Sequence, residues 1–183
     1  QAAGEMAENL TKGLQELGMP SVQIHFEFTA RTRPDSSGCD AVRFLFTANK
    51  QMPLQDVAQT ASGGEIARVM LTLKALIAQK RNLPTIIFDE IDTGVSGTMA
   101  ERMGRVMQRM GQSAQVLCIT HLPQIAALGK VHFWVHKQES DTGTTSNIRA
   151  LSADERVQEI ANMLSGAAIT EAALTNARQL LDE

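Results

Sequence analysis

Thr85-Ile-Ile-Phe-Asp-Glu90 decides the fold, because an apolar run of strand length passes directly into two adjacent acids. Apolar strands of this kind are typical of parallel sheets that helices cover on both faces. Such sheets hold their ligands just beyond the carboxyl ends of the strands. The stretch therefore predicts an α/β fold, with a mostly parallel sheet flanked by helices and a polar site at Asp89 and Glu90.

A glycine-rich helix start lies upstream, at Ser62-Gly63-Gly64-Glu65. Serine before a helix and glutamate at its third position form a capping box, which explains Ser62 and Glu65. It does not explain the glycines, each of which costs about 1 kcal/mol of helix propensity relative to alanine. Helices accept that cost where a ligand approaches backbone N–H groups, and the usual ligand at a helix N-terminus is an anion. A plain helix cap and a phosphate-binding helix start both fit these four residues.

Asp89 and Glu90 also fit two roles. Acids after a strand are commonly N-caps of the next helix, but here the loop Ile91–Gly97 follows, and Ser96 is the better cap. In the functional interpretation Asp89 holds Mg²⁺ through water, because Mg²⁺ keeps most of its hydration shell. Glu90 then orients or deprotonates an attacking water molecule, which needs a carboxylate within hydrogen-bond reach.

The next apolar strand, Val116–Thr120, is followed by His121, which we expect at the same edge of the sheet. A single histidine is more often structural than catalytic, but this position makes His121 a candidate donor to a γ-phosphate oxygen. His132 and His136 are four residues apart in a strand-like run. We interpret them as surface or packing residues, because no further Cys or His lies nearby to complete a zinc site.

A phosphate-cradling loop of the form G-x-x-x-x-G-K-[ST] occurs nowhere in the chain. The pair Gly129-Lys130 has Gln124 where the first glycine of that motif would stand. We therefore interpret the chain as the nucleotide-facing half of an ATPase, formed by the acids, the glycine-rich helix start and the histidine. The half that carries the phosphate-cradling loop is missing.

The chain has 183 residues, 43% hydrophobic and 20% charged, as is typical of one soluble globular domain. Its net charge of −3 argues against a broadly basic nucleic-acid surface. No apolar stretch approaches the roughly 18 residues of a membrane span, and the start has no signal-peptide pattern. Cys39 and Cys118 form no C-x-x-C pair, which favours a reducing cytoplasm over a metal knuckle. The absent initiator Met suggests a fragment or a processed chain.

Hydrophobic spacing predicts the elements of the first half. The N-terminal helix ends at Gly18-Met19-Pro20, and its short apolar seam fits either the end of a coiled coil or a helix packed on the domain. Strands Val22–Phe28 and Ala41–Thr47 are expected to form an antiparallel hairpin with a loose tip at Arg33–Gly38. A helix from Gly63 to Lys80 is expected to bury an apolar stripe. The seam is Ala3, Met6, Leu10, Gly13 and Leu17, and the stripe is Ile66, Met70, Leu73 and Ile77.

The second half continues with a helix over Ser96–Met110 and a short helix through Ile125 and Leu128. Strands Val131–His136 and Thr145–Leu151 are expected to close around the turn Asp141-Thr142-Gly143. Two helices end the chain. The first begins with a capping box and ends at glycine, the residues being Ser152, Glu155 and Gly166.

The order and spacing of three segments are more specific than any one of them. The segments are Gln59-Thr-Ala-Ser-Gly-Gly-Glu-Ile-Ala-Arg68, Thr85-Ile-Ile-Phe-Asp-Glu-Ile-Asp-Thr-Gly-Val-Ser-Gly97 and Ile119-Thr-His-Leu-Pro-Gln-Ile-Ala-Ala127. In that order they resemble the signature motif, the Walker B motif with its D-loop, and the H-loop of ABC-type ATPases. Within that superfamily these motifs and the tail Glu155–Gly166 are similar to the RecN family, whose members are SMC-like DNA repair proteins. Leu122 departs from ABC transporters, which usually carry an acid there.

The resemblance implies that residues 19–183 form the C-terminal lobe of an ABC-type ATPase head. Residues 1–18 would be the end of a coiled-coil arm or a packed helix. The implied cofactors are ATP and Mg²⁺. Asp89 would hold the metal, Glu90 and His121 would be catalytic, and Asp92 of the D-loop would communicate across the interface between two heads. The nucleotide-binding residues would be Ser62, Gly63, Gly64, Glu65 and Asp92.

The implied partners are an N-terminal lobe carrying Walker A, a second head with the signature motif acting in trans, and DNA, but no membrane. The implied function is ATP-driven head dimerisation in double-strand-break repair and recombination, in the cytoplasm at the bacterial nucleoid. The chain alone would be inactive, because the Walker A lobe is missing.

Three alternatives remain. The lobe could belong to another SMC-family ATPase of chromosome organisation, or to an ATPase that partners a double-strand-break nuclease. A hydrolase using Ser62, His121 and Glu90 is a different class, but no G-x-S-x-G elbow supports it. The third alternative is a purely structural lobe.

Overall fold

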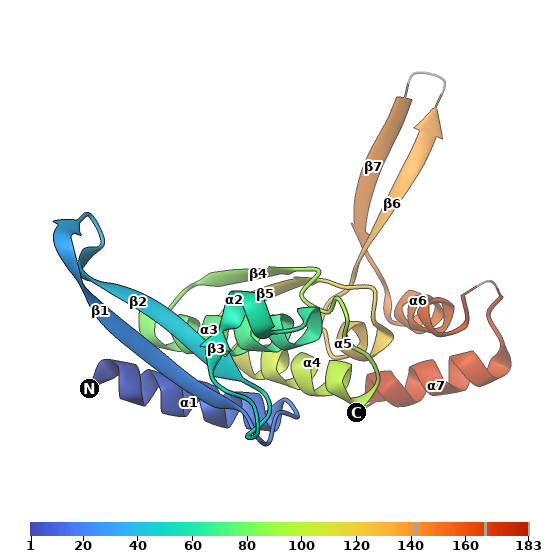
Figure 1. Cartoon of the computed structure of the whole chain (residues 1–183). Coiled ribbons are helices and arrows are strands. Elements are labelled where there is room, and N and C mark those ends of the chain that lie inside the picture. Colours follow the sequence, from blue (N-terminus) through green and yellow to red (C-terminus); the bar gives the residue numbers. More distant parts are fainter. Residues whose placement is uncertain (141–142, 167, 183) are drawn as a thin grey trace. The chain divides into compact units, whose positions relative to one another are not determined.

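The computed structural model describes residues 1–140, 143–166 and 168–182. Helices and strands are interspersed along the chain, which confirms the α/β class (Figure 1). The chain divides into two compact units, Gln1–Ile119 and Thr120–Glu183. No described helix has the length and apolar character that crossing a membrane requires.

The first unit contains a helix, a hairpin with a short third strand, a one-turn helix, and two further helices beside a pair of parallel strands. Its elements are α1 (Ala2–Glu16), β1 (Gln23–Asp35), β2 (Gly38–Thr47), β3 (Gln55–Asp56), α2 (Val57–Thr60), α3 (Gly63–Arg81), β4 (Thr85–Asp89), α4 (Thr98–Met110) and β5 (Gln115–Ile119).

The predicted hairpin is confirmed, but its strands are longer than expected. β1 and β2 pair antiparallel, and β1 runs through the predicted loose tip as far as Asp35. Pro34 is tolerated because the register shifts between Ala30 and Asp35, so the ladder does not need its missing N–H. One face is apolar: the rings of Phe26 and Phe44 lie 5.0 Å apart. This face leads into a core formed by Leu14, Met19, Val22, Phe46 and Val69.

Helix α1 is packed at its C-terminal end. Leu10, Leu14 and Leu17 are buried, whereas Met6 near the start is exposed. The helix contacts β1 and α3. A side chain at Gly13 would collide with Thr72 of α3, which accounts for the glycine in the predicted seam. The last turns of α1 therefore belong to this unit, and Leu14 is a core residue that the seam pattern missed.

The predicted apolar stripe of α3 is wrong as a core face. Ile66, Met70 and Ile77 are exposed, and the buried residues of α3 are Val69, Leu71 and Thr72. The helix does span Gly63–Arg81, close to the predicted bounds. Val69 and Thr72 face the packed end of α1, so the stripe marks a side of α3 that the described chain leaves open.

Strands β4 and β5 form the predicted parallel pair, with Ile87 opposite Leu117 and Asp89 opposite Ile119. Parallel pairing is confined, within the described ranges, to these two strands, since the β1-β2-β3 and β6-β7 sheets are antiparallel. The inner face of β4 is buried, whereas Ile87 on the other face is 57% exposed. This sheet thus has one uncovered apolar face.

The cap predicted for α4 is also wrong. Gly97, not Ser96, is its N-cap residue, with φ 56° and ψ −135°. This positive φ suits glycine and disfavours serine, so the backbone path rather than side-chain capping decides where α4 begins.

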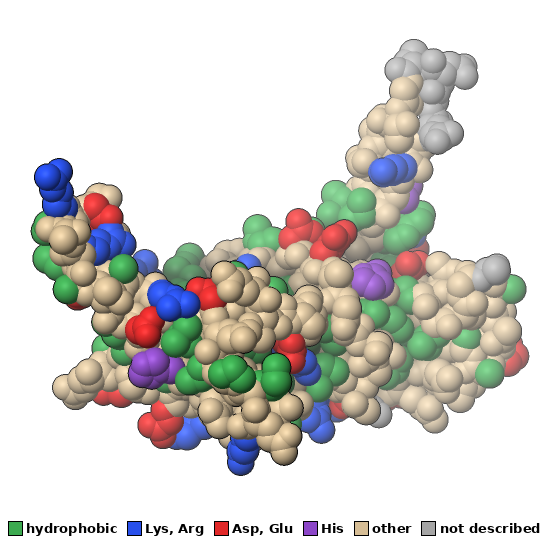
Figure 2. All heavy atoms as spheres, in the orientation of Figure 1, with side chains coloured by type: hydrophobic (Ala, Val, Ile, Leu, Met, Phe, Trp, Pro, Cys, Tyr) green, Lys and Arg blue, Asp and Glu red, His purple; other side chains and the backbone are tan. Residues whose placement is uncertain are grey.

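The second unit contains α5 (Pro123–Ala127), β6 (Phe133–Ser140), β7 (Gly143–Ala150), α6 (Ala153–Ser165) and α7 (Glu171–Asp182). β6 and β7 form a ribbon that projects from the helices of this unit (Figure 1). Apolar side chains remain on the surface near the base of the ribbon (Figure 2). Asp141 and Thr142 of the predicted turn lie outside the described residues. The unit's core is formed by Ala127, Ile160, Ala161, Ala173 and Ala177.

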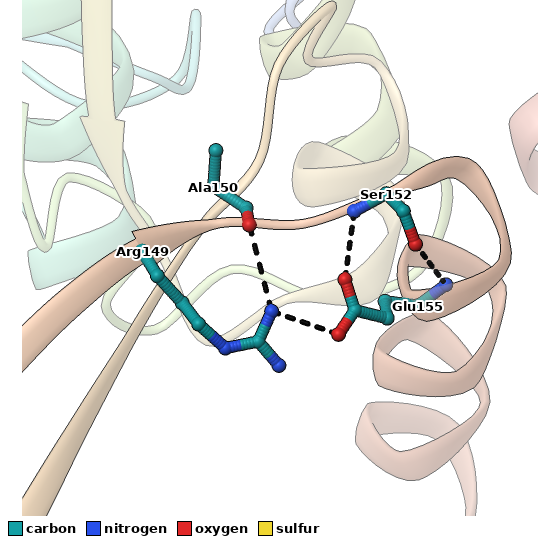
Figure 3. Close-up of polar contacts among 4 residues, drawn as sticks. All are labelled: Arg149, Ala150, Ser152 and Glu155. Atoms are coloured by element: carbon teal, nitrogen blue, oxygen red, sulfur yellow. Dashed lines mark hydrogen bonds and ion pairs between the residues drawn. The ribbon is translucent and has the colours of Figure 1, made fainter.

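The predicted capping box at α6 is confirmed (Figure 3). The Ser152 N–H donates to the Glu155 carboxylate over 2.9 Å, and the Glu155 N–H donates to the Ser152 hydroxyl over 3.4 Å. Arg149 adds an ion pair to Glu155 over 2.8 Å. Gly166 ends the helix with φ 73°, as predicted.

Candidate functional site

The first unit has a pocket of about 310 Å³ where the start of α3 meets the end of β4. Gly63 from the glycine-rich helix start and both acids, Asp89 and Glu90, line it. The structure therefore brings together two of the motifs singled out from the sequence. The other lining residues are Ile66, Ala67, Met70, Lys74, Ile91 and Thr93.

Glu90 has a left-handed backbone conformation, with φ 47°. Its N–H donates to the carbonyl of Ile119 over 3.2 Å, so the β4–β5 ladder continues to this residue before the chain turns. Thr93 then donates its N–H and its hydroxyl to the Glu90 carbonyl, over 3.3 and 3.0 Å. A non-glycine residue at positive φ is uncommon, and such residues cluster at functional sites. The backbone thus singles out Glu90 independently of its charge.

Ser62 and Glu65 contact each other at the start of α3. The Glu65 carboxylate accepts from the Ser62 N–H over 2.8 Å and from the Ser62 hydroxyl over 2.7 Å. The half of the capping box in which the glutamate reaches back to the cap residue is therefore formed. The hydroxyl proton of Ser62 is directed to a carboxylate in this state.

The two glycines at the start of α3 lie in different surroundings, so the lack of a side chain has a different consequence at each position. A side chain at Gly63 would meet open space, which leaves the helix start accessible. A Cβ atom at Gly64 would lie 2.9 Å from the carbonyl oxygen of Gly94. Gly94 itself has φ 75°. Gly64 is therefore needed where the loop after β4 packs on α3, a reason that the helix-propensity argument did not contain.

Asp92 is fully buried in the loop between β4 and α4. Its charge lies close enough to Cys118 of β5 to act on that thiol. Burial first, and Asp92 second, raise the pKa of Cys118 to about 11. Asp92 is thus a fixed part of the loop's interior, and any effect it has on a partner must pass through the loop's conformation.

His121 follows β5, whose last residue Ile119 is paired with Asp89. His121 belongs to the second unit and is not among the residues that line the pocket. In that unit, His132 approaches the carbonyl of Ala126, and the ring of His136 stacks on Trp134 with centroids 4.2 Å apart. Burial is the main cause that lowers the pKa of His132.

Lys74 is a pocket residue that the motifs did not reveal. Its ammonium lies 5.3 Å from the ring centroid of Phe88, and it lines the same pocket as the two acids. A signal was present in the sequence: Gly63, Ala67, Met70 and Lys74 follow one another at helical spacing of four and three residues. The exposed stripe of α3 is therefore in part a pocket wall.

The pocket fits a magnesium ion better than it fits a triphosphate. Its carboxylates are oxygen ligands, and a hydrated Mg²⁺ needs only one or two of them. Its described cation is Lys74 alone, set against Asp89 and Glu90. A polyphosphate would need many more donors than this wall of the pocket supplies.

Comparison with known proteins shows the chain's family. It is 39% identical over 180 residues to the DNA repair protein RecN of Vibrio cholerae, covering 98% of this chain and 32% of that protein. It is 40% identical over 179 residues to RecN of Deinococcus radiodurans, covering 98% of this chain and 31% of that protein. The chain belongs to the RecN family. It spans about a third of the length of these RecN relatives. No protein-family model matches it.

Solved structures place this RecN-family chain in the fold of SMC heads. The Smc head domain of Pyrococcus yayanosii, solved with a coiled coil and joint, has a TM-score of 0.65 at 18% identity, over 84% of this chain and 28% of that one. A chain from a study of ATP-driven dimerisation of SMC ATPases has a TM-score of 0.61 at 17% identity, over 88% of this chain and 92% of that one. The fold prediction is thereby confirmed.

Proposed function

We propose that this RecN-type chain forms the C-terminal lobe of an ATP-hydrolysing head, which acts in DNA double-strand-break repair and recombination. One observation carries the proposal: Glu90 is held in a left-handed conformation at the end of β4, in a pocket shared with Asp89 and the start of α3. The RecN relatives, which are DNA repair proteins, supply the biological setting.

In this proposal Asp89 holds a hydrated Mg²⁺ and Glu90 is the general base for the attacking water. A bound magnesium ion would neutralise charge on the phosphates of ATP. His121 would donate a hydrogen bond to the γ-phosphate. The role of Asp92 is to keep the D-loop in the conformation that packs on Gly64, because Asp92 is itself buried.

An N-terminal lobe with Walker A is proposed to complete the head. Parallel sheets are normally covered on both faces, yet Ile87, Leu117 and Ile119 leave one face of β4–β5 exposed and apolar. The relatives are about three times as long as this chain, so a covering segment has room to exist. That lobe would also supply the phosphate donors that the pocket lacks.

A second head is proposed to bring its own Ser62 and Gly63 to the γ-phosphate. The helix start at Gly63 is open, and a helix N-terminus carries partial positive charge that favours an anion. Hydrolysis would reopen the pair of heads and pass motion to DNA-bound segments. This setting implies the cytoplasm, at the nucleoid.

The serine hydrolase alternative is disfavoured by Ser62 itself, whose hydroxyl donates to the capping residue Glu65 rather than to His121, the base that this alternative requires. A head of another SMC-type ATPase remains the closest rival, because the solved neighbours share that fold. The RecN identity of 35% to 40% favours the repair role. A purely structural lobe would not require a strained carboxylate in a pocket.

Glu90→Gln in the full-length protein tests the proposal. We expect kcat for ATP to fall about 10²-fold or more, the range for loss of a general base, with ATP binding retained. Asp89→Asn should instead weaken Mg²⁺-ATP binding. Glu171→Gln, an exposed site at the start of α7, is the matched control. If Glu90→Gln and Asp89→Asn both lose ATP affinity, the division of roles is wrong.

A further inference from the structure

The end of α1 has a Schellman motif, whose two bonds together with the last regular helical bond satisfy three carbonyls. The N–H of Gly18 donates to Gln15 over 3.1 Å, and the N–H of Met19 donates to Leu14 over 3.0 Å. Leu17 donates to Gly13 over 3.2 Å. This is the usual arrangement for a helix that ends at a left-handed glycine. Two carbonyls at the end of the helix, on Glu16 and Leu17, are not part of it.

Arginines from two other helices donate hydrogen bonds to those two carbonyls. Arg68 of α3 donates to the Leu17 carbonyl over 3.3 Å, and Arg102 of α4 donates to the Glu16 carbonyl over 3.4 Å. Arg109 of α4 also pairs with the Glu16 side chain over 3.0 Å. Cations at a helix C-terminus are favoured by the helix dipole. The last turn of α1 is therefore held by three arginines.

Arg68 contacts the start of its own helix as well as the end of α1. Its Nε donates to the carbonyl of Gly64 over 3.1 Å, while its Nη1 donates to Leu17. One guanidinium thus bridges the glycine-rich start of α3 and the end of α1. Gly64 in turn contacts Gly94 of the loop after β4. A displacement at the start of α3 therefore reaches the end of α1 through a single rigid group.

Helix α4 makes a second connection. It begins directly after the D-loop, and the methyl end of Met99 in its first turn fills the space beside Gly18, where a Cβ atom would approach it to 2.4 Å. Arg102 lies one turn further along the same helix. Both nucleotide-facing segments, the start of α3 and the D-loop, are thus connected to the same turn of α1.

We propose that Arg68, with Arg102, is a positioning residue that sets the direction of α1 according to the conformation of the α3 start and the D-loop. The nucleotide dependence of this inference rests on the proposed function. The other part, that Arg68 fixes α1 in the absence of nucleotide, is independent of the proposed function. Arg68 reaches its two carbonyls from two different nitrogen atoms of a planar fork, Nε and Nη1, whereas a lysine would present all of its donors from a single nitrogen.

The test uses the full-length protein with spin labels at two exposed sites, Glu5→Cys on α1 and Gln79→Cys on α3. The exposed thiol of Cys39 is replaced by serine, as are other accessible cysteines of the protein. Pulsed electron paramagnetic resonance then measures the distance between the labels, without nucleotide and with ADP–beryllium fluoride. Arg81→Gln is the matched control, because it removes the same charge from the last turn of α3.

We expect one narrow distance distribution that shifts with nucleotide in the parent protein and in Arg81→Gln. Arg68→Gln should broaden the distribution without nucleotide and lose the shift. Arg68→Lys should fail to restore it, whereas Arg102→Lys, which needs only one bond, should behave like the parent although Arg102→Gln does not. A merely structural role would lower the melting temperature of these variants and leave the shift intact.

Two results would overturn the inference: a distribution in Arg68→Gln as narrow as that of the parent without nucleotide, or full rescue by Arg68→Lys. Loss of the shift in Arg81→Gln would also overturn it, since charge alone would then be the cause. A parent protein that shows no shift and no ATP binding would sink the proposed function instead. The nucleotide-free comparison of Arg68→Gln with the parent would still decide the positioning role.

Discussion

At the scale of single residues, Glu90 combines a strained backbone with a carboxylate that the proposed chemistry needs. The left-handed conformation of a non-glycine residue costs on the order of 1 kcal/mol, and glycine avoids that cost. We therefore expect Glu90→Gly to raise the stability of the head by up to about 1 kcal/mol while abolishing ATP hydrolysis. Urea unfolding of the parent, Glu90→Gly and Glu90→Gln measures this. Equal midpoints for the two variants would mean that Glu90 stores no strain.

Cys118 provides a second prediction at this scale. Burial and the neighbouring charge of Asp92 raise its pKa to about 11. Because only the thiolate reacts, its alkylation at pH 8 should be roughly 10²-fold slower than that of an ordinary thiol. Cys39, which is exposed, is the internal comparison. Mass spectrometry after timed iodoacetamide treatment measures both rates. Asp92→Asn should speed the alkylation of Cys118 and leave the rate at Cys39 unchanged. Equal Cys118 rates in the parent and the variant would show that Asp92 does not raise the pKa of this thiol.

The residues of the site were predictable where the reason is local. The contact of Ser62 with Glu65 follows from their three-residue spacing, and the position of Asp89 and Glu90 follows from the strand before them. The reason for Gly64 was not predictable, because it depends on the carbonyl of Gly94, which lies on a separate loop. Arg68 was missed for the same reason, since the Leu17 carbonyl that it also reaches lies 51 residues away in sequence, at the end of α1.

At the scale of elements, α3 shows why periodicity alone misassigned a face. Its stripe has correct helical spacing, but Ile66 is 39% exposed and Met70 is 40% exposed. The spacing identifies an apolar face without saying what covers it. In this chain Gly13 and Thr72 bring α1 onto the other side of α3, so the stripe is left for another segment. The bounds of α3 depend on local capping and were predicted closely.

The start of α6 supports a pH-dependent prediction. Hydrogen bonds from Ser152 are the main cause that lowers the pKa of Glu155 below its ordinary value of 4.5, and Arg149 adds to this (Figure 3). A lowered pKa means that the stabilisation is complete above pH 4.5 and is lost as pH falls through the lowered pKa. Glu155→Gln should therefore be less stable than the parent near neutral pH, and the difference should shrink in acid below pH 4.5. Thermal unfolding across that range measures it. A difference that stays constant with pH would rule out the charged capping box as its source.

At the scale of the whole molecule, the described pocket contains only part of the groups that ATP binding would need. The described pocket supplies carboxylates and an open helix start, but its cation is Lys74 alone. The missing donors must come from elsewhere if ATP is the ligand. Because the relatives are about three times as long, an N-terminal lobe is the simplest source for the phosphate cradle. The open end of α3 then remains available for a phosphate held by a second head.

Ser62→Arg tests whether that helix start acts in trans. The larger side chain fills the open space beside Gly63 and should prevent closure of two heads, so the full-length variant should bind ATP but neither dimerise nor hydrolyse it. Mixing it with a variant that lacks the Walker A lysine produces heterodimers in which one composite site carries both changes and the other carries neither. Partial ATPase activity should therefore return.

Ser113→Arg, at an exposed turn, is the matched control and should remain active alone. If crosslinked heterodimers form without activity and Ser62→Arg has lost its own ATP binding, Ser62 acts within its own head. If that binding is retained, the two sites must hydrolyse together, and a single intact site is not enough.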